Sequence, residues 1–578
     1  MSSEHDRPEL PNDSPVSHLE DHGEFIRRHI GPDDADIEHM LSVLGLDSLD
    51  ALVEETVPAS IRLREPLDLL PPQNEHEALE RLRAIAGRNV LRHSMIGMGY
   101  HDTITPAVIR RNILENPGWY TAYTPYQAEI SQGRLEAMLT FQQMVCDLTA
   151  MEIANASLLD EATAAAEAMA MLKRLNRKSR SMRFLVDEGV FPQTLDVIRT
   201  RGESFGFEVV VGNAAAELPG GDFFGVLLQY TRSDGGIADI EPVIRQAHEQ
   251  GILAAVATDL LALALLKPPG EMSADIVLGS AQRFGVPMGF GGPHAAFFAT
   301  RDDFKRALPG RIIGVSRDRH GRPALRMALQ TREQHIRRDH ATSNICTSQA
   351  LLAVMAAMYA VYHGAEGLRR IARRIHRLTG VLAAGLGPLG FEPVNHDFFD
   401  TLSFALPEEQ ADAILARAEA AGINLCHSPE GLRISVNEKT NRTYISTLWE
   451  AFAGSAGLTG FVATDEALAE DWSAIPERFR RQSSFLEHPV FSRYRSETEM
   501  MRYLKRLENR DLSLTHAMIS LGSCTMKLNA SSEMLPVSWP EFAQMHPFAP
   551  PEQAEGYHQL FRELEAMLIA CTGYEAVS

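Results

Sequence analysis

The spacing of apolar and polar residues divides the first 90 positions into three stretches. Residues 1–20 are polar and contain three prolines, which predicts an unstructured lead. Residues 25–53 carry apolar side chains at helical spacing, with Ile37, Met40 and Leu44 on one face. Residues 56–75 contain four prolines and predict an extended arm. An arm of this kind either wraps a partner or serves as a surface linker.

Between residues 91 and 340, short apolar runs alternate with helical patterns. Amphipathic helices are predicted at 134–148 and 162–175, and a further helical segment at 240–250. Continuous apolar runs of the kind found in buried strands occur at 184–186, 208–211, 224–228, 252–256, 276–278 and 295–298. Buried strands separated by helices are typical of a mainly parallel sheet that is covered on both faces.

The pattern after residue 340 predicts a second, smaller α/β domain. A long helix is expected over 343–374, with its apolar residues on one face. The apolar runs at 391–394, 401–404 and 432–435 predict a small sheet that packs with two helices. The composition changes again over 454–490, which indicates a linker.

A repeat of very long period runs through the chain. Residues 93–99 (HSMIGMG) return as 516–522 (HAMISLG), so that 516 − 93 = 423. Residues 149–152 (TAME) return as 572–575 (TGYE) at the same spacing. Such a period predicts duplication of a whole folding unit, because the repeats of solenoids are only a few tens of residues long. The chain therefore contains one complete copy of the unit and the beginning of a second.

Composition favours an intracellular enzyme of several domains. Hydrophobic residues make up 45% of the 578 positions and charged residues 23%, which is ordinary for globular proteins. The net charge of −21 argues against nucleic acid and anionic membranes as general partners. The five cysteines lack metal-type spacing and favour reduced thiols over a disulfide framework. No run of about twenty apolar residues and no signal or transit peptide is present, so we expect a cytoplasmic location.

Two local features point to chemistry. The predicted parts are those of a fold-type I pyridoxal-phosphate enzyme, and the competing nucleotide-binding fold lacks its glycine motif here. Asp259 ends an apolar run, where a carboxylate either pairs with the pyridinium nitrogen of the cofactor or caps a turn. The run at 276–278 leads into a glycine-rich segment at 289–293, which lets backbone approach a cofactor or another chain.

Several segments resemble one enzyme family in order along the chain. They are residues 25–32 (FIRRHIGP), 123–133 (YTPYQAEISQG), 155–161 (NASLLDE), 282–287 (QRFGVP), 332–338 (REQHIRR) and 522–527 (GSCTMK). This pattern resembles glycine dehydrogenase (decarboxylating), the P-protein of the glycine cleavage system, over about residues 22–578. The resemblance implies a pseudo-dimer of two fold-type I halves. It also implies decarboxylation of glycine on pyridoxal phosphate, with transfer of the aminomethyl group to the lipoyl arm of the H-protein.

The chain departs from the family at the residue that anchors the cofactor. The resemblance implies a Schiff-base lysine in the second half, and the matching position in the first half is Gln282. An amide nitrogen is not nucleophilic, so Asp259 and Gln282 are expected to be degenerate cofactor-binding positions without covalent attachment. Recruitment of Lys267 or Lys305 as a new anchor is a third interpretation.

The beginning of the second copy contains the remaining candidate catalytic residues. Ser523, Thr525 and Lys527 match the loop that borders the active cleft in the family. Leu564 and Leu568 lie further along and are expected to pack against strands that the chain lacks. We therefore expect residues beyond about 528 to be mobile or to mediate self-association, in a truncated chain, a split gene product or a cut fragment.

The resemblance also implies the domain organisation and the partners. We expect an N-terminal helical segment and arm, a large α/β domain, a small α/β domain, a linker and an incomplete second repeat, at residues 1–90, 91–342, 343–455, 456–495 and 496–578. The expected partners are the lipoylated H-protein, the second half of the P-protein and glycine, without nucleic acid or membrane, in a homo- or hetero-oligomer. The alternative is a catalytically inactive scaffold or regulatory pseudo-subunit.

One charged region stands out from this acidic chain. Eleven arginines and lysines lie between Arg301 and Arg338, and nearby acidic residues offset only part of their charge. A basic strip of this kind is suited to phosphate, to carboxylates or to an acidic partner such as a lipoylated carrier protein. A solvated face with internal ion pairs is the alternative.

Overall fold

The computed structural model describes two compact units. Described residues are 15–16, 23–29, 31–63, 65–121, 125, 127–329, 334–338, 341, 343, 345, 349–455, 460–518 and 528–578. One unit comprises Met1–Val90, Ala530–Phe542 and Pro550–Ser578. The other comprises Leu91–Asn529 and Ala543–Ala549.

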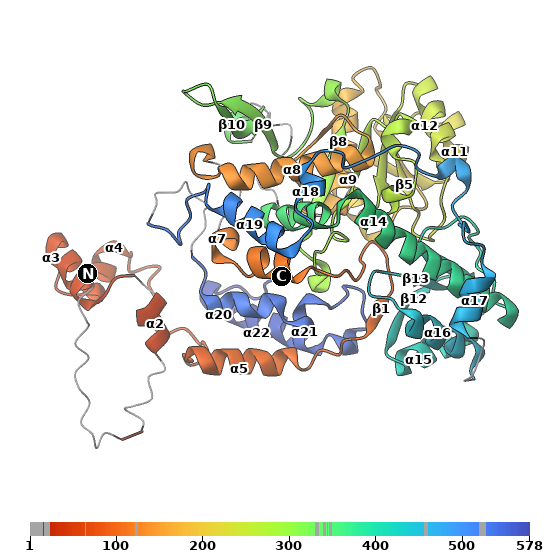
Figure 1. Cartoon of the computed structure of the whole chain (residues 1–578). Coiled ribbons are helices and arrows are strands. Elements are labelled where there is room, and N and C mark those ends of the chain that lie inside the picture. The colour runs from red at the N-terminus through yellow and green to blue at the C-terminus, as the bar shows by residue number, and fades with distance from the viewer. Residues whose placement is uncertain are drawn as a thin grey trace. The chain divides into compact units, whose positions relative to one another are not determined.

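The larger unit is built on a seven-stranded sheet of order β2-β8-β7-β6-β5-β3-β4 (Figure 1). The strands are β2 (Ile153–Ala154), β3 (Arg183–Asp187), β4 (Glu208–Gly212), β5 (Gly225–Tyr230), β6 (Leu253–Thr258), β7 (Ile276–Ser280) and β8 (Ala296–Thr300). Strands β4, β3, β5, β6 and β7 are parallel to one another, whereas β8 runs antiparallel to β7, and the edge strand β2 runs antiparallel to β8. The predicted mainly parallel sheet is confirmed.

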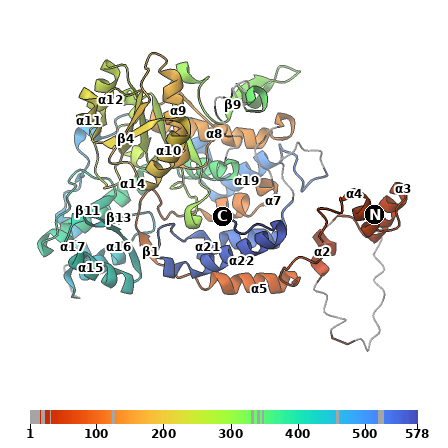
Figure 2. The same cartoon turned by 180° about the vertical axis from the view of Figure 1, so that it is seen from behind.

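Helices cover both faces of this sheet, as Figures 1 and 2 show from two sides. Val226 and Leu228 of β5 join the core formed with α8 (Gln132–Thr149), α12 (Ile240–Glu249) and α14 (Ala350–Leu386). Leu227, between them, points to the opposite core, formed with α9 (Glu161–Leu175) and α10 (Pro192–Phe205). Successive strand residues face opposite sides, so the apolar runs of the sequence are buried on both.

A smaller four-stranded sheet has the order β1-β12-β13-β11. Its strands are β1 (His93–Met95), β11 (Thr401–Ala405), β12 (Ile423–Ser428) and β13 (Gly431–Ser435). Helices α15 (Glu408–Ala420), α16 (Arg442–Ala453) and α17 (Phe461–Ala467) belong to the same part of the chain. The predicted strand at 391–394 is wrong, because these residues form no strand and Pro393 has no N–H to donate.

The long helix α14 connects the two sheets and is longer than predicted. It ends at Leu386 rather than near residue 374, and Gly364, at φ +64°, interrupts its helical geometry. Its length and composition would allow it to cross a membrane, but 61% of its most apolar window is buried inside the protein. That burial is the behaviour of a core helix.

The smaller unit contains short N-terminal helices. The single helical pattern over residues 25–53 is divided in the structure into α2 (Glu24–His29), α3 (Asp34–Leu44) and α4 (Leu49–Thr56). Gly45, at φ +74°, caps the end of α3, and Ser48 caps the start of α4. A glycine in this left-handed conformation ends a helix readily, which is why the pattern is broken there.

The 423-residue period recurs in the helices themselves. Helix α22 (Glu555–Thr572) begins and ends 423 residues after α8, since 555 − 132 and 572 − 149 are equal. Helix α19 (Glu497–Glu508) follows α5 (Glu75–Ala86) at a spacing of 422 (497 − 75). In the larger unit α19 packs on α8, and in the smaller unit α5 packs on α22.

Two equivalent glycines show how closely these pairs fit. A Cβ added to Gly133 of α8 would overlap the carbonyl oxygen of Leu507, and one added to Gly556 of α22 would overlap that of Ile85. The β-bridges Ser131–Asp511 and Asn89–Ala554 lie beside these glycines. Ser131 corresponds to Ala554 at a spacing of 423 residues, and Asn89 corresponds to Asp511 at a spacing of 422. In each pair, a helix from one copy of the repeat packs on a helix from the other.

Candidate functional site

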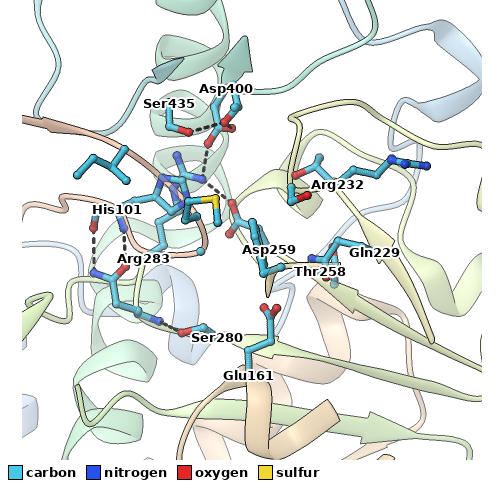
Figure 3. A pocket seen from close by; sticks show the side chains of 18 of the residues that line it. His101, Glu161, Gln229, Arg232, Thr258, Asp259, Ser280, Arg283, Asp400 and Ser435 are labelled. Atoms are coloured by element: carbon cyan, nitrogen blue, oxygen red, sulfur yellow. Dashed lines mark hydrogen bonds and ion pairs between the residues drawn. The ribbon is translucent and has the colours of Figure 1, made fainter. Parts of the chain in front are cut away.

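A pocket lies within the larger unit where the strand ends of the large sheet meet the small sheet (Figure 3). Gln229 of β5, Thr258 of β6 and Ser280 of β7 line it from the large sheet. Thr401, Arg433 and Ser435 line it from the small sheet, and His101 and Glu161 complete the wall. The carboxyl ends of parallel strands are where α/β folds bind ligands, so this is the candidate site.

Gln282 follows β7, and its amide is fully used inside the protein. Its side chain is 1% exposed. The amide oxygen accepts a hydrogen bond from the backbone N–H of His101 at 3.0 Å. The amide nitrogen donates to the carbonyls of His101 at 2.9 Å and Val286 at 2.7 Å. Gln282 thus ties residue 101 to the end of β7.

Asp259, directly after β6, is engaged on both carboxylate oxygens. Oδ1 accepts from the backbone N–H of Leu261 at 2.8 Å, as in a capped turn. Oδ2 lies 2.6 Å from Nη1 of Arg283, and the same Nη1 lies 2.6 Å from Oδ2 of Asp400. Figure 3 shows the guanidinium between the two carboxylates. The Asp259 carboxylate, which a cofactor ring would need as its partner, is therefore already paired with the side chain of Arg283.

Arg283 also links the two sheets of the larger unit. It is 4% exposed, and Nη2 donates to the carbonyl of Val436 at 3.3 Å. Asp400 immediately precedes β11 of the small sheet. Burial alone would lower the pKa of Arg283, but the charges of Asp400 and Asp259 reverse that effect, so its pKa is raised and it stays cationic.

Two other titratable groups in the pocket are neutral near pH 7. Burial raises the pKa of Glu161 to about 8, and the carboxylates of Asp259 and Asp160 add to the shift while Thr194 opposes it. Burial also lowers the pKa of His101 well below its ordinary value, with Arg283 as the next cause. Both groups therefore keep the form that carries no charge.

Glu161 occupies the N-terminus of α9, which faces the pocket. Asp160 caps the helix by accepting from the backbone N–H of Thr163 at 2.7 Å. Helix N-termini attract anions such as phosphate because their N–H groups point outward. Here the helix presents two carboxyl groups of its own at that end.

The two lysines considered as alternative anchors lie away from this pocket. Lys267 is paired with Glu241 at 2.7 Å, and Lys305 is paired with Asp302. Neither lines the pocket, and no lysine does so among the described residues. Ser523, Thr525 and Lys527 fall outside the described residues.

Sequence reasoning missed four residues that shape the pocket. Arg283 stands next to Gln282 and could have been found as a charged residue in an otherwise apolar segment. Glu161 follows the helix-capping Asp160, which was a second available signal. Asp400 and His101 come from distant segments, and nothing local in the sequence marks them.

The fold, a large mainly parallel sheet and a small sheet joined by a long helix, is that of the fold-type I class of pyridoxal-phosphate enzymes. A family model described as glycine cleavage system P-protein matches residues 27–452. The chain belongs to this family, which confirms the resemblance and the predicted fold class.

Comparisons with individual relatives support the same family assignment. The chain is 58% identical over 566 residues to glycine dehydrogenase (decarboxylating) of Idiomarina loihiensis, covering 97% of this chain and 58% of that protein. It is 57% identical over 570 residues to that of Teredinibacter turnerae, covering 98% and 59%. The crystal structure of a glycine decarboxylase (P-protein) in inhibitor-bound form is 33% identical, with a TM-score of 0.68 over 74% of this chain and 99% of that one. The chain thus spans about three-fifths of the curated relatives' length.

Pyridoxal phosphate is the cofactor of this family, but the pocket described here does not fit it. The aldehyde needs a lysine amine, and Gln282 supplies a hydrogen-bonded amide. The pyridinium needs a free carboxylate, and Asp259 is bound to Arg283. The phosphate needs donors, and the nearby helix end carries Asp160 and Glu161.

Proposed function

We propose that this chain is the half of a glycine cleavage P-protein that lacks the Schiff-base lysine. In the complete protein, glycine would be decarboxylated and its aminomethyl group passed to the lipoyl group of the H-protein. The observation that carries the proposal is the combination of family membership with a pocket lined by a fully bonded Gln282 and by Arg283 bound to Asp259 and Asp400. We expect the chain alone to be inactive and the complex to work in the cytoplasm.

The repeated helices support a second half as partner. Because α5 packs on α22 and α19 packs on α8, each copy of an internal duplication supplies a helix to the other. The same close approach occurs at Gly133 and at Gly556. Reciprocal contacts of this kind are what a two-fold pseudo-dimer requires.

The exposed apolar face of helix α22 supports a second half as partner. Its residues Phe561, Leu564 and Leu568 are 43%, 51% and 38% exposed. Their counterparts in α8, 423 residues earlier, are Met138, Phe141 and Val145, each 0% exposed. In α8 this face lies in the core shared with α14 and the large sheet. Because these side chains are already half-buried, each would gain about half of the roughly 1.5–3 kcal/mol that full burial gives, so a second large domain is the natural cover.

The chemistry would take place in the second half. Pyridoxal phosphate bound there supplies an electron sink for the bond that breaks when carbon dioxide leaves. Ser523, Thr525 and Lys527 would border that cleft and orient the substrate carboxylate through hydroxyl and ammonium donors. The first-copy pocket would contribute no group to the reaction.

An exchange assay tests this proposal. Glycine-dependent exchange of labelled carbon dioxide is measured with the chain alone, with a separately expressed second half, and with both. We expect exchange only when the second half is present and an increase when the two are combined. Strong exchange by the chain alone would refute the proposal.

The contacts inside the pocket also favour the second candidate, a scaffold or regulatory pseudo-subunit. Arg283 joins the large sheet to the small sheet, and Gln282 joins residue 101 to the end of β7, as structural elements would. Titration of the chain into the second half separates the two interpretations. If the second half is fully active alone and the chain changes only its regulation or assembly, the pseudo-subunit is correct.

A further inference from the structure

A two-stranded hairpin in the larger unit carries most of the exposed part of the basic strip. It consists of β9 (Ile312–Arg317) and β10 (Pro323–Ala328), paired antiparallel, and it is separate from the large sheet. At its root, Ile313 and Met327 are 2% and 6% exposed and belong to the main core. Figures 1 and 2 both show the hairpin projecting beside α8.

The turn at the tip is rigidly built. The carboxylate of Asp318 accepts hydrogen bonds from the backbone N–H groups of His320 at 2.8 Å and Arg322 at 2.9 Å. The N–H of Gly321 donates to the carbonyl of Asp318 at 3.0 Å. A turn fixed in this way presents its side chains in a constant arrangement, which lowers the entropy lost when a partner binds.

Four exposed arginines on this hairpin, Arg317, Arg319, Arg322 and Arg326, have no carboxylate partner in the described part of the chain. Nη1 of Arg317 donates to the carbonyl of Gly321 at 3.1 Å, and Nε of Arg319 donates to His320 at 3.0 Å. Among the described residues, none of the four takes part in an ion pair, whereas Arg301 and Lys305, just before the hairpin, are each paired with an aspartate. Val315, which lies on β9 among these arginines, is 70% exposed.

The hairpin is attached to the start of α8, next to a contact with Asp511. At the start of α8, the side chain of Gln132 accepts from the N–H of Leu325 and donates to its carbonyl, both at 2.9 Å. The preceding residue, Ser131, forms a β-bridge with Asp511, and Asp511 is paired with Arg134 at 2.7 Å. The start of α8 therefore anchors both the basic hairpin and the segment at Asp511, which precedes the predicted cleft residues in the sequence.

We propose that the β9–β10 hairpin is the docking surface for a carboxylate-rich face of the carrier protein that bears the lipoyl group. This inference rests on the proposed function, which requires such a carrier. In a chain of net charge −21, a projecting group of unpaired guanidinium groups attracts and orients an acidic partner. Guanidinium forks also match carboxylates in geometry, and the exposed Val315 adds an apolar contact.

The test compares two triple variants with the same change in charge. One is Arg319→Glu/Arg322→Glu/Arg326→Glu on the hairpin. The control is Arg177→Glu/Lys178→Glu/Arg180→Glu, on an exposed loop of the same unit whose cations form no ion pair with any described residue. Each protein is combined with the second half, and binding of purified lipoylated H-protein is followed by biolayer interferometry.

We expect the association rate constant of the hairpin variant to fall at least about tenfold at about 0.05 M NaCl, with the dissociation rate nearly unchanged. At about 0.5 M NaCl the difference should shrink to within about twofold, because screening removes steering. The control should stay within about threefold of wild type at either salt concentration.

Four outcomes would overturn the inference. Equal losses in the two variants would show that only net charge matters, and unchanged binding by the hairpin variant would show that the carrier docks elsewhere. Tight binding of a short DNA duplex, lost in the hairpin variant, would assign the hairpin to nucleic acid instead. If the wild-type complex itself binds no H-protein, the proposed function fails together with the inference. If the wild-type complex binds H-protein and only the hairpin assignment is wrong, the proposed function still stands.

Discussion

Replacing Arg283 with methionine should destabilise the larger unit more than any single surface change. Methionine keeps most of the length of the side chain but removes the guanidinium that lies 2.6 Å from both Asp259 and Asp400. The Asp400 side chain is only 6% exposed and would be left charged without a cation. Breaking a buried pair in this way costs about 3–5 kcal/mol. Asp259, at 22% exposure, can be rehydrated in part and should add less.

A control arginine isolates the effect of burial. Arg478 also lies near two carboxylates, Asp239 and Asp397, but its side chain is 62% exposed. Arg478→Met should therefore cost less than about 1 kcal/mol, as exposed pairs usually do. Urea unfolding, followed by tryptophan fluorescence and circular dichroism, gives the change in the free energy of unfolding for both variants.

A double variant tests whether the loss comes from the unpaired carboxylate. Arg283→Met/Asp400→Asn removes the cation and the charge together, so it should be more stable than Arg283→Met alone by about 1–3 kcal/mol. If Arg283→Met costs no more than Arg478→Met, or if Asp400→Asn gives no recovery, the ion-pair reasoning is refuted.

Three further predictions concern other parts of the chain. Glu161 has a folded-state pKa of about 8 against an ordinary 4.5, so its contribution to stability is fully present below pH 4.5 and is lost as the pH rises through 8. Urea midpoints across this range should show a loss of about 2–4 kcal/mol in wild type that is absent in Glu161→Gln. Gly133→Ala should detach α19 from α8, because the added Cβ would overlap the Leu507 carbonyl. Limited proteolysis near residue 508 should then be faster than in wild type. A digestion pattern like that of wild type would contradict this prediction. Leu564→Asp should reduce self-association and weaken complementation by the second half at least about tenfold, with no change in the thermal stability of the chain alone. Unaltered complementation would count against α22 as the surface that contacts the second half.

The large sheet could be predicted from the sequence because its strands are continuous apolar runs. Strands β3, β5 and β6 are buried on both faces, so each appears as an unbroken run flanked by polar residues. The hairpin β9–β10 was not recognised, since its arginines dominate the pattern and only its root is buried. Pairing of β1 with β12 joins residues more than 300 positions apart, and no local signal encodes it.

The pocket was predictable only in part, for a similar reason. Asp259 and Gln282 follow apolar strands, so local sequence places them at the same edge of the sheet. What fills the pocket depends on long-range contacts. Arg283 reaches Asp400 in the small sheet, and Gln282 binds the backbone of His101, which approaches from the N-terminal side. Local pattern therefore locates the pocket but does not show that it is closed.

The central claim, that this chain does not hold the family's cofactor, is tested most directly by its pyridoxal content. The purified chain is incubated with pyridoxal phosphate, dialysed, reduced with borohydride and mapped by mass spectrometry. We predict no aldimine absorption band and no stoichiometric phosphopyridoxyl-lysine, because Gln282 and the Arg283–Asp259 pair occupy the places that the cofactor needs. One adduct per chain, at Lys267, Lys305 or another lysine, that is lost in the Asp259→Ala variant would contradict the account.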